Sequence, residues 1–406
     1  MAIIVQKFGG TSVGSLERIE NVAEQIIKTK QQGHQVVAVL SAMSGETNRL
    51  TELANKLDPN PSPRELDMLL ASGEQVSIAL LSIALIKRGF SAVSLLAHQI
   101  GLLTDNRFNK ARILNVDNQR MLKELQQGHI VIVAGFQGND NEGNITTLGR
   151  GGSDTSAVAI ATALQAKECQ IFTDVDGVYT TDPRLDENAR KLPYVSFEEM
   201  LEMASSGAKV LQSRSVEFAG NHKMPLRVLS SFSEGDGTSI TFEQQADKTH
   251  PVSAITSHKD EAMISASGVE SGEKFRNKLF ALLAKVDIEV DMLTQTAKDN
   301  DKINLSFTVH RNDYQQTLRI ANSLTADFSI EQLCGNNKVV KISAIGNGMR
   351  SHSGVAAELF ECLLDNKIDV YLVSAAEIKI SVLVKESDLT SAVCFLHEKF
   401  QLNVTN

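Results

Sequence analysis

Residues 5–15 read VQKFGGTSVGS, a stretch that joins a short strand to a helix through two glycines. Such glycines let backbone N–H groups approach phosphate oxygens, and a helix that begins directly afterwards turns its positive end toward the same place. Lys7 precedes the glycines, whereas the lysine of the nucleotide loop G-x-x-x-x-G-K-[ST] follows them. The stretch is a candidate phosphate cradle, although a glycine turn with a solvated lysine explains the same residues equally well.

The alternation of strands and helices continues to about residue 243. The strand-like segments are Ile3–Lys7, Gln35–Ser41, Ala92–Leu96, Ile130–Ala134 and Gln170–Thr173. The helix-like segments include Leu16–Lys30, Arg64–Lys87 and Asp154–Gln165. This alternation predicts βαβ units, and therefore an α/β fold whose mostly parallel sheet is covered by helices on both faces. The polar run GNDNEGN at 138–144 predicts the tip of a hairpin.

The last third of the chain contains an internal repeat. KLFALLAKVDIEVDML (278–293) matches ELFECLLDNKIDVYLV (358–373), and INLSFTV (303–309) matches IKISVLV (378–384). Each copy reads strand, helix, strand, strand, helix, strand, which is the order of a ferredoxin-like α+β module. Two copies in tandem suggest paired modules that bury their sheet edges against each other.

A domain boundary is expected at the polar run QQADKTH (244–250), which precedes Pro251. The predicted domains are an α/β domain over 1–245 and α+β modules over 262–337 and 338–406, with a strand from 250–261 as a candidate to complete the second module.

The composition excludes several classes of protein. The formal charge is −9 and we find no basic stripe, which argues against nucleic-acid binding. No apolar run approaches ~20 residues, so no membrane span is expected, and the N-terminus MAIIVQKFGG lacks a signal sequence, which favours the cytoplasm. The four cysteines are far apart and are expected to be reduced, small buried side chains, with no zinc site: Cys169, Cys334, Cys362 and Cys394.

A second glycine-rich stretch, TTLGRGGSDTSAVAIATALQA (146–166), places Arg150 among three glycines. Ser153 and Asp154 then open an alanine-rich helix, where such residues normally act as caps. Capping does not require an arginine between glycines, however. A guanidinium fixed beside bare N–H groups is a good bidentate receptor for a carboxylate, and Asp154 would then hold Mg²⁺ or orient a lysine.

The stretch FTDVDGVYTTDPR (172–184) runs from a strand into a loop rich in turn residues. Open α/β sheets bind ligands at the carboxyl ends of their strands, and an aromatic ring offers a flat face to a base. The alternative is a structural turn, because V-D-G and D-P are ordinary turn sequences. The candidate nucleotide contacts are Thr173, Asp174, Tyr179, Asp182 and Arg184.

Glu74 lies in SGE (72–74), inside a long helical pattern, and Thr47 lies in the earlier loop SAMSGETNRL (41–50). A single glutamate on a helix usually belongs to a solvated face, so neither residue defines a site by itself.

Taken together, three motifs resemble those of the aspartate kinases, in the same order along the chain. They are KFGGTSV (7–13), GRGGSDT (149–155) and TDVDGVY (173–179). The first two are highly specific, whereas the third is shared more loosely with other amino-acid kinases. The resemblance covers nearly the whole chain, and the tandem repeat resembles the paired ACT domains of the single-function form. It implies a three-layer αβα amino-acid-kinase fold followed by two ferredoxin-like ACT modules.

The resemblance implies that the γ-phosphoryl group of ATP, with Mg²⁺, is transferred to the β-carboxylate of L-aspartate. The product would be 4-phospho-L-aspartate, at the first step toward lysine, threonine and methionine. A carboxylate is already ionised at pH 7, so no general base is needed. Catalysis is therefore expected from positioning and from neutralising the charge of two anions that must meet. No histidine or cysteine cluster has metal-ligand spacing, so Mg²⁺ would come with ATP.

The resemblance also implies roles for single residues. The catalytic residues would be Lys7 and Asp154. The ATP site would comprise Lys7, Phe8, Gly9, Gly10, Ser12, Thr173, Asp174, Tyr179, Asp182, Arg184 and Lys209. The aspartate site would comprise Thr47, Glu74, Arg150, Gly151, Gly152 and Ser153, with Glu74 on the ammonium and Arg150 on a carboxylate.

The regulatory half departs from the family pattern. Residues 270–273 read ESGE where a stretch of the Asp-(Lys/Arg)-Pro-Gly type is usual, Ser353 replaces a usual proline, and 374–377 carries fewer hydroxyls. Fewer hydroxyls leave fewer donors for an amino-acid effector, so feedback by lysine or threonine stays open. The candidate effector residues are Asp291, Gln295, Ser353, Val355, Ser374 and Glu377. A homodimer through the ACT modules is expected with or without an effector.

Two other functions compete with an active aspartate kinase. One is a related kinase that acts on acetylglutamate, glutamate or a nucleoside monophosphate, and the Arg150 loop and the tandem repeat argue against it. The other is a catalytically silent amino-acid-binding regulator, and the intact Lys7, Arg150 and Asp154 argue against that.

Overall fold

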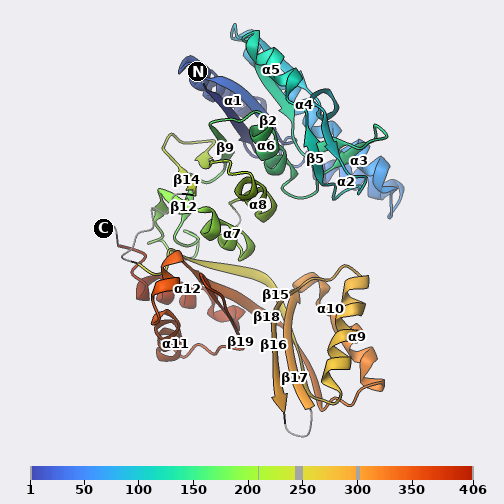
Figure 1. The fold of residues 1–406 in the computed structure, drawn as a ribbon, viewed down its shortest axis with the longest axis vertical. Helices are drawn as coiled ribbons and strands as arrows, with labels where there is room; N and C mark the ends of the chain where they lie inside the picture. The colour runs from blue at the N-terminus through green and yellow to red at the C-terminus, as the bar shows by residue number, and fades with distance from the viewer. Residues whose placement is uncertain (1, 209, 243–249, 299–301, 405–406) are drawn as a thin grey trace. The chain divides into compact units, whose positions relative to one another are not determined.

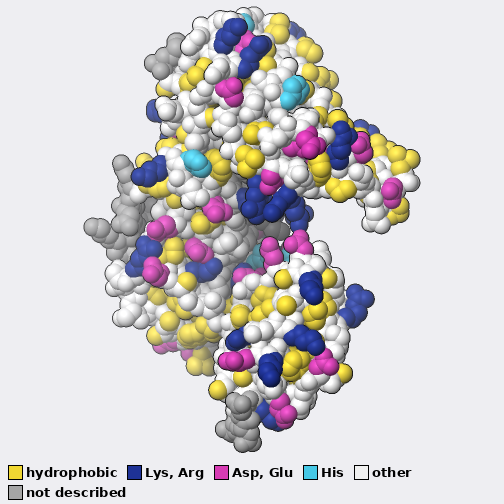
Figure 2. Space-filling view, turned by 45° about the vertical axis from the view of Figure 1, so that its right-hand side comes forward, with side chains coloured by type: hydrophobic (Ala, Val, Ile, Leu, Met, Phe, Trp, Pro, Cys, Tyr) yellow, Lys and Arg dark blue, Asp and Glu magenta, His cyan; other side chains and the backbone are white. Residues whose placement is uncertain are grey.

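The computed structural model describes residues 2–208, 210–242, 250–298 and 302–404. Its contacts divide the chain into two compact units. The first comprises Met1–Val178, Lys191–Ala204 and Lys209–Gln245, and the second comprises Tyr179–Arg190, Ser205–Ala208 and Ala246–Asn406. On the face that Figure 2 shows, basic and acidic side chains are interspersed among hydrophobic and polar ones.

The first unit is built on an eight-stranded sheet (Figure 1). In spatial order its strands are β12 (Tyr194–Ser196), β14 (Thr238–Thr241), β13 (Leu226–Ser230), β9 (Glu168–Thr173), β1 (Ile3–Phe8), β2 (Gln35–Leu40), β6 (Ile130–Ala134) and β3 (Ala92–Leu95). Neighbours pair in parallel except β13 and β14. The five strands predicted from the sequence are confirmed as β1, β2, β3, β6 and β9.

Helices cover both faces of this sheet. They are α1 (Leu16–Gln31), α2 (Glu46–Leu57), α3 (Pro63–Leu70), α4 (Ser72–Lys87), α5 (Gln119–Gln126), α6 (Gly152–Ala163), α7 (Phe197–Ser205) and α8 (Ser213–Asn221). Val36, Ala38 and Leu40 of β2 pack with α1 and α4 in one core. The alternate residues Val37 and Val39 are also fully buried, and α6 contacts β1 and β9, so the predicted three-layer αβα arrangement is confirmed.

The helix-like segment predicted over Arg64–Lys87 is helical, but it is interrupted at Ala71, between α3 and α4. The Ala71 carbonyl accepts a hydrogen bond of 3.0 Å from Gln137 Nε2, and the Ser72 hydroxyl donates to the Leu69 carbonyl at 2.7 Å. By length and composition the stretch Pro63–Lys87 would suffice to cross a membrane, but 56% of its most apolar window is buried inside the protein, as in the core helix of a soluble protein.

Two smaller sheets are formed by strands between residues 102 and 192. One joins β5 (Ile113–Val116), β4 (Leu102–Thr104), β7 (Gln137–Asn139) and β8 (Ile145–Thr147), and the other joins β10 (Val178–Tyr179) and β11 (Lys191–Leu192). β7 and β8 pair antiparallel, which confirms the hairpin predicted at 138–144.

The second unit contains a six-stranded sheet with the order β16 (Val290–Lys298), β17 (Lys302–His310), β15 (Ala254–Val269), β18 (Gln332–Ile345), β20 (Lys379–Lys385) and β19 (Leu372–Ala375). Its helices are α9 (Gly272–Lys285), α10 (Tyr314–Ser323), α11 (Val355–Asp365) and α12 (Leu389–Lys399). Figure 1 shows α9 and α10 lying side by side along this sheet.

The long antiparallel strands β15 and β18 serve both copies of the repeat. In one copy, the second half of β15 is followed by α9, β16, β17, α10 and the first half of β18. In the other, the second half of β18 is followed by α11, β19, β20 and α12, and Ala254–His258 pairs with Lys341–Ile345. The predicted order of elements is confirmed in the first copy, whereas in the second no strand follows α12 in the described residues and Ala254–His258 supplies the last strand. Each copy has its own hydrophobic core.

The expectation of four buried cysteines is only partly correct. Cys169 and Cys362 are buried and Cys394 is half-buried, but Cys334 is exposed. Its neighbour Leu333 packs on the core of the first copy, and because side chains alternate along a strand, Cys334 faces the other way.

Candidate active site

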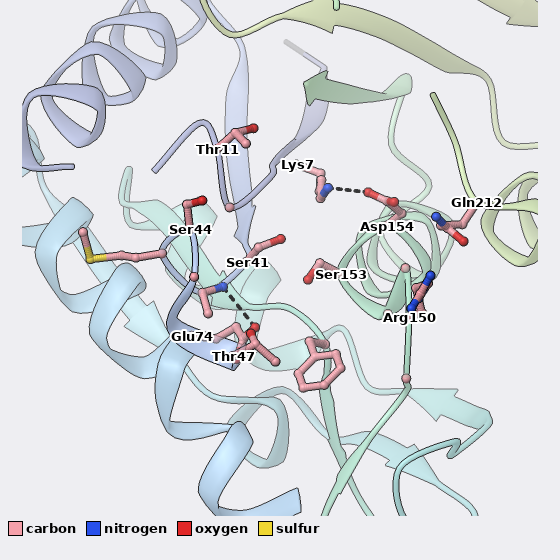
Figure 3. A pocket seen from close by; sticks show the side chains of 18 residues that line it. Lys7, Thr11, Ser41, Ser44, Thr47, Glu74, Arg150, Ser153, Asp154 and Gln212 are labelled. Atoms are coloured by element: carbon pink, nitrogen blue, oxygen red, sulfur yellow. Dashed lines mark hydrogen bonds and ion pairs between the residues drawn. The ribbon is translucent and has the colours of Figure 1, made fainter. Parts of the chain in front are cut away.

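A cavity of about 460 Å³ lies in the first unit, where β1 and β2 end and α6 begins (Figure 3). Parallel sheets commonly bind ligands at this edge. The cavity brings together both predicted catalytic residues, all the predicted aspartate-site residues and one glycine of the predicted ATP site: Lys7, Asp154, Thr47, Glu74, Arg150, Gly151, Gly152, Ser153 and Gly10.

Lys7 and Asp154 form the charged centre of this cavity. Lys7 lies near the end of β1, and its Nζ is 2.5 Å from Oδ1 of Asp154, with both side chains nearly buried. Asp154 lies in the first turn of α6, where a negative charge interacts favourably with the helix dipole. The carboxylate of Asp154 therefore fixes the ammonium group of Lys7, and Figure 3 shows the two side chains pointing toward one another.

The loop after β1 approaches its neighbours very closely. The Gly9 N–H donates to the Phe172 carbonyl at 3.4 Å, and the Ser12 N–H donates to the Gly9 carbonyl at 2.9 Å. A Cβ on Gly10 would lie only 3.0 Å from the Ala42 carbonyl oxygen. The second glycine is therefore required by close backbone contact, which a simple surface turn does not impose.

The loop before α6 is held by two glycines in the left-handed conformation, Gly149 with φ +76° and Gly151 with φ +71°. Gly151 is itself the N-cap of α6 and no side chain caps this helix, so the capping role for Ser153 and Asp154 is wrong. Arg150 between the glycines is exposed and has no ion pair within the described residues. Its guanidinium is available to a ligand carboxylate.

Glu74 is not on a solvated face, because only 3% of the residue is exposed. Its Oε1 accepts a hydrogen bond of 3.0 Å from the Ala42 N–H, whereas Oε2 has no hydrogen-bond partner in the described part of the chain. Burial raises the pKa of this carboxyl to about 8, despite the opposing hydrogen bond from Ala42. A buried acid that lines a cavity with one free oxygen is suited to bind a cation.

Several further cavity residues were missed by the sequence reasoning, among them Ser41, Phe136 and Gln212. Ser41 directly follows β2, so the rule that ligands bind at strand ends could have found it. Phe136 adopts φ +67°, which no motif signals. Gln212 precedes α8 and lies beside Arg150 in Figure 3. A Cβ on Gly151 would lie 2.1 Å from Gln212 Cγ, a contact made only by the tertiary fold.

The other described residues of the predicted ATP site do not line this cavity. Phe8 is fully buried and stacks on Phe172 with ring centroids 4.7 Å apart, so only its backbone is left to meet a nucleotide. Ser12 is buried and its hydroxyl lies 2.6 Å from that of Ser231. Lys209 lies outside the described residues. Gly9, Thr173 and Asp174 belong to the first unit, and Tyr179, Asp182 and Arg184 belong to the second. Their contacts with ATP stay predictions.

The candidate effector residues all lie in the second unit. Asp291 pairs with Lys341, Gln295 accepts a hydrogen bond from Arg276 at 2.9 Å, and Glu377 lies 3.2 Å from Arg350. The others are Ser353 in the loop before α11, Val355 at its start and Ser374 on β19. Their roles also stay predictions.

The αβα sheet and its strand-end cavity define a class of protein, the amino-acid kinases, and the comparisons agree. The model of the amino acid kinase family matches residues 2–230, and that of the ACT domain matches residues 342–400. An aspartate kinase of Stutzerimonas stutzeri is 50% identical over 404 residues, which cover 99% of this chain and 98% of the relative. The aspartokinase of Pseudomonas aeruginosa is 51% identical over 405 residues, with the same coverage.

A crystal structure of Escherichia coli aspartokinase III in complex with aspartate and ADP, in the R-state, superposes with a TM-score of 0.81 at 26% identity. The match covers 98% of this chain and 99% of that one. The chain belongs to the amino acid kinase family and, within it, to the aspartate kinases.

Proposed function

We propose that the enzyme transfers the γ-phosphoryl group of ATP to the β-carboxylate of L-aspartate, at the first step toward lysine, threonine and methionine. A carboxylate oxygen attacks the γ-phosphorus, the bond to the bridging oxygen breaks, and 4-phospho-L-aspartate and ADP leave. The observation that carries the proposal is that, among the described residues, Oε2 of buried Glu74 has no hydrogen-bond partner and Arg150, in the same cavity, has no ion pair. An amino acid presents one ammonium group and carboxylates, so a carboxyl group and a guanidinium match it.

The geometry supports catalysis by charge neutralisation. The Lys7 ammonium faces the cavity from the end of β1 and is fixed by Asp154 at 2.5 Å. It is in place to stabilise charge that develops on the transferred phosphoryl group. The N-terminus of α6 and the backbone of Gly10 add N–H groups at the same edge. Because the acceptor is already ionised at neutral pH, no side chain has to remove a proton.

The residues fit a Mg²⁺ ion that arrives with ATP. Within the described ranges, no group of three or more His, Cys, Asp or Glu side chains is arranged to hold a metal ion. Mg²⁺ in kinases needs no such cage, because phosphates, waters and one or two carboxylates satisfy its six positions. Asp154 would supply a carboxylate, and the bound ion would neutralise phosphate charge.

The test is ADP release with Mg-ATP and each candidate acceptor, while the acyl phosphate is trapped with hydroxylamine. We expect aspartate hydroxamate with L-aspartate and a background signal with glutamate, N-acetylglutamate or a nucleoside monophosphate. Turnover with one of those acceptors and none with aspartate would overturn the proposal. Binding of an amino acid by calorimetry without any turnover would instead support a silent regulator.

We also infer a cytoplasmic homodimer that pairs through its ACT modules, for which lysine and threonine are the candidate effectors. E. coli aspartokinase III has been crystallised with lysine and aspartate in a T-state, and that structure superposes with a TM-score of 0.78 at 26% identity. Assays with lysine and threonine, singly and together, test the effector, and light scattering tests the dimer. Unchanged activity at millimolar concentrations of both amino acids would exclude feedback by either.

A further inference from the structure

We propose that His397, on the last helix of the second ACT module, is a positioning residue for the segment Tyr179–Arg190 and thereby sets the affinity of the enzyme for ATP. The inference rests on the proposed function, because Tyr179, Asp182 and Arg184 in this segment are the predicted nucleotide contacts. It gives the second module a structural route by which to influence nucleotide binding.

His397 contacts Thr180 near the start of the segment and Asp186 in its middle. Only 1% of the residue is exposed. Its Nε2 lies 2.8 Å from the Thr180 hydroxyl, and its Nδ1 lies 2.9 Å from Oδ2 of Asp186. The Thr180 hydroxyl also accepts a hydrogen bond of 2.9 Å from the Arg190 N–H, and the Thr180 N–H donates to the Arg190 carbonyl at 2.8 Å. The His397 imidazole and the Thr180–Arg190 hydrogen bonds therefore hold the start, middle and end of the segment together.

These contacts fit a neutral imidazole. The Arg190 N–H donates to the Thr180 hydroxyl, and a neutral ring with its proton on Nδ1 lets that hydroxyl donate to Nε2 of His397. Nδ1 then faces Oδ2 of Asp186 at 2.9 Å. Protonation would place a second N–H on Nε2, so the Thr180 hydroxyl would have to turn its own proton away.

The same segment is attached to the second module at four more points. The Ile255 N–H donates to the Thr180 carbonyl at 2.7 Å, and Nε of Arg190 donates to the Leu402 carbonyl at 2.6 Å. The thiol of Cys394 donates to the carbonyl of Leu185 at 3.4 Å, and the Leu185 side chain packs on the core of the module. A shift of α12 would therefore move the segment with it.

The predicted nucleotide contacts lie between these attachment points. Arg184 Nε and Nη2 donate to the Asp182 carboxylate at 2.9 and 2.7 Å, and hydrogen bonds from Arg184 lower the pKa of that carboxyl. The Leu185 N–H donates to the Asp182 carbonyl at 2.9 Å. The segment is thus held in one conformation before ATP binds, which reduces the entropy lost on binding.

The charged groups that face His397 are Asp186 and Arg190. Burial lowers the pKa of His397 below its ordinary value of 6.5, with Asp186 opposing the shift and Arg190 adding to it. The imidazole is therefore neutral at pH 7 and becomes protonated only in acid. We expect KM for ATP to rise below about pH 6 in the wild-type enzyme.

The test compares KM for ATP with KM for aspartate in the full-length enzyme. In His397→Gln we expect KM for ATP to rise about tenfold and to lose its acid dependence, with KM for aspartate and kcat within about twofold, as expected for lost hydrogen bonds. Thr180→Val is expected to raise KM for ATP about threefold and Thr180→Ser to restore it. Glu398→Gln, at the exposed next residue of α12, is the matched control.

Hydrogen exchange supplies a second measurement, since amides of 180–190 are expected to exchange faster in His397→Gln. An unchanged KM for ATP in His397→Gln, together with a raised KM in Arg184→Ala, would overturn the positioning role and leave the function intact. An equal rise of both KM values with a lower melting temperature would reduce His397 to a stabilising residue. Absence of aspartate-dependent turnover in the wild type would overturn the function itself, and calorimetry with Mg-ADP would then test the positioning role.

Discussion

Lys7 and Lys341 are both nearly buried and both pair with carboxylates, but their surroundings differ. Lys7 in the first unit meets Asp154 at 2.5 Å and lines the cavity. Lys341 in the second unit lies on β18 with its side chain 5% exposed, and it pairs with both Asp291 and Glu261, the latter at 3.4 Å. Glu261 lies where the register of β15 against β18 shifts.

The ammonium group of Lys7 can still bind a ligand, whereas that of Lys341 is already neutralised by two carboxylates. An ammonium group has three N–H donors. Asp154 is the single ion-pair partner of Lys7 among the described residues, so its other donors face the cavity. Lys341 pairs with the buried Glu261 and with Asp291, whose side chain is about half exposed, so we interpret it as a structural residue. The predictions below test this assignment, from the largest expected effect on turnover to the smallest.

Lys7→Ala is expected to lower kcat by about a thousandfold or more, because it removes the cation that faces the transferred phosphoryl group. Hydroxamate formation measures the loss, and an unchanged circular dichroism spectrum shows that the fold survives. The matched control is Lys28→Ala, since Lys28 is exposed and pairs at 2.6 Å with an exposed Glu234. Wild-type kcat in Lys7→Ala would refute the catalytic role.

Gly151→Ala is expected to lower kcat/KM about a hundredfold. The new Cβ would collide with Gln212 Cγ, 2.1 Å away, and displace the N-terminus of α6 that carries Asp154. Gly143→Ala separates the clash from backbone strain, because Gly143 has φ +82° and open space around its Cβ position. That control should lose about 1 kcal/mol of stability and no activity. Equal kinetics of the two variants would contradict the role of the close contact.

Glu74 predicts a pH dependence of aspartate binding. Its pKa of about 8 leaves the carboxyl protonated at neutral pH in the ligand-free enzyme, whereas an ammonium group binds the ionised form. We therefore expect KM for aspartate to fall as pH rises from 6 to 8, by up to about tenfold per unit. Glu74→Gln should abolish this dependence and raise KM about tenfold at pH 8. Glu52→Gln, on the exposed face of α2, is the control.

The stability of the free enzyme should change with pH in the opposite sense. The folded-state pKa of Glu74 is raised, so its contribution to stability is complete below about pH 4.5 and is lost as pH rises through about 8. Thermal unfolding above pH 8 should therefore show a higher melting temperature for Glu74→Gln than for the wild type. A lower melting temperature of Glu74→Gln than of the wild type above pH 8 would contradict the claim that the ionised Glu74 carboxylate destabilises the free enzyme.

The fold was largely predictable because its signals are local. The apolar spacing in Leu16–Gln31 and the capping Ser15, whose hydroxyl accepts from the Arg18 N–H at 3.3 Å, are both visible in the sequence. The break at Ala71 was not, because it depends on Gln137, which is distant in the sequence and bonds the Ala71 carbonyl. Local propensity favours a continuous helix there, and a tertiary hydrogen bond overrides it.

The site residues that belong to sequence motifs could be predicted. Lys7, Arg150 and Asp154 belong to glycine-rich stretches whose backbone requirement is itself a signal. Glu74 was recognised only through the family resemblance, since its burial depends on packing around α4 and on the Ala42 N–H. Gln212 and His397 have no motif at all, and both act through contacts with residues far away in the sequence.

Lys341→Met is expected to leave kcat and both KM values unchanged while it lowers stability by about 3 kcal/mol, because Glu261 remains buried without this cation. At present the charge and hydrogen bond of Lys341 outweigh the effect of burial and lower the pKa of Asp291. Thermal unfolding at pH 7 measures the loss. Lys338→Met, at an exposed position of the same strand, should unfold like the wild type.

The double variant Lys341→Met/Glu261→Gln isolates the cause of that loss. Glu261 is 3% exposed, so replacing its charge by an amide removes the larger part of the unpaired burial. The second substitution should therefore recover much of the melting temperature, although it would destabilise the enzyme when Lys341 is present. If the losses of stability in the two single variants simply add in the double variant, Lys341 stabilises the protein through packing of its aliphatic chain. Lys341 and Lys7 would then differ in burial and not in how their charges are paired.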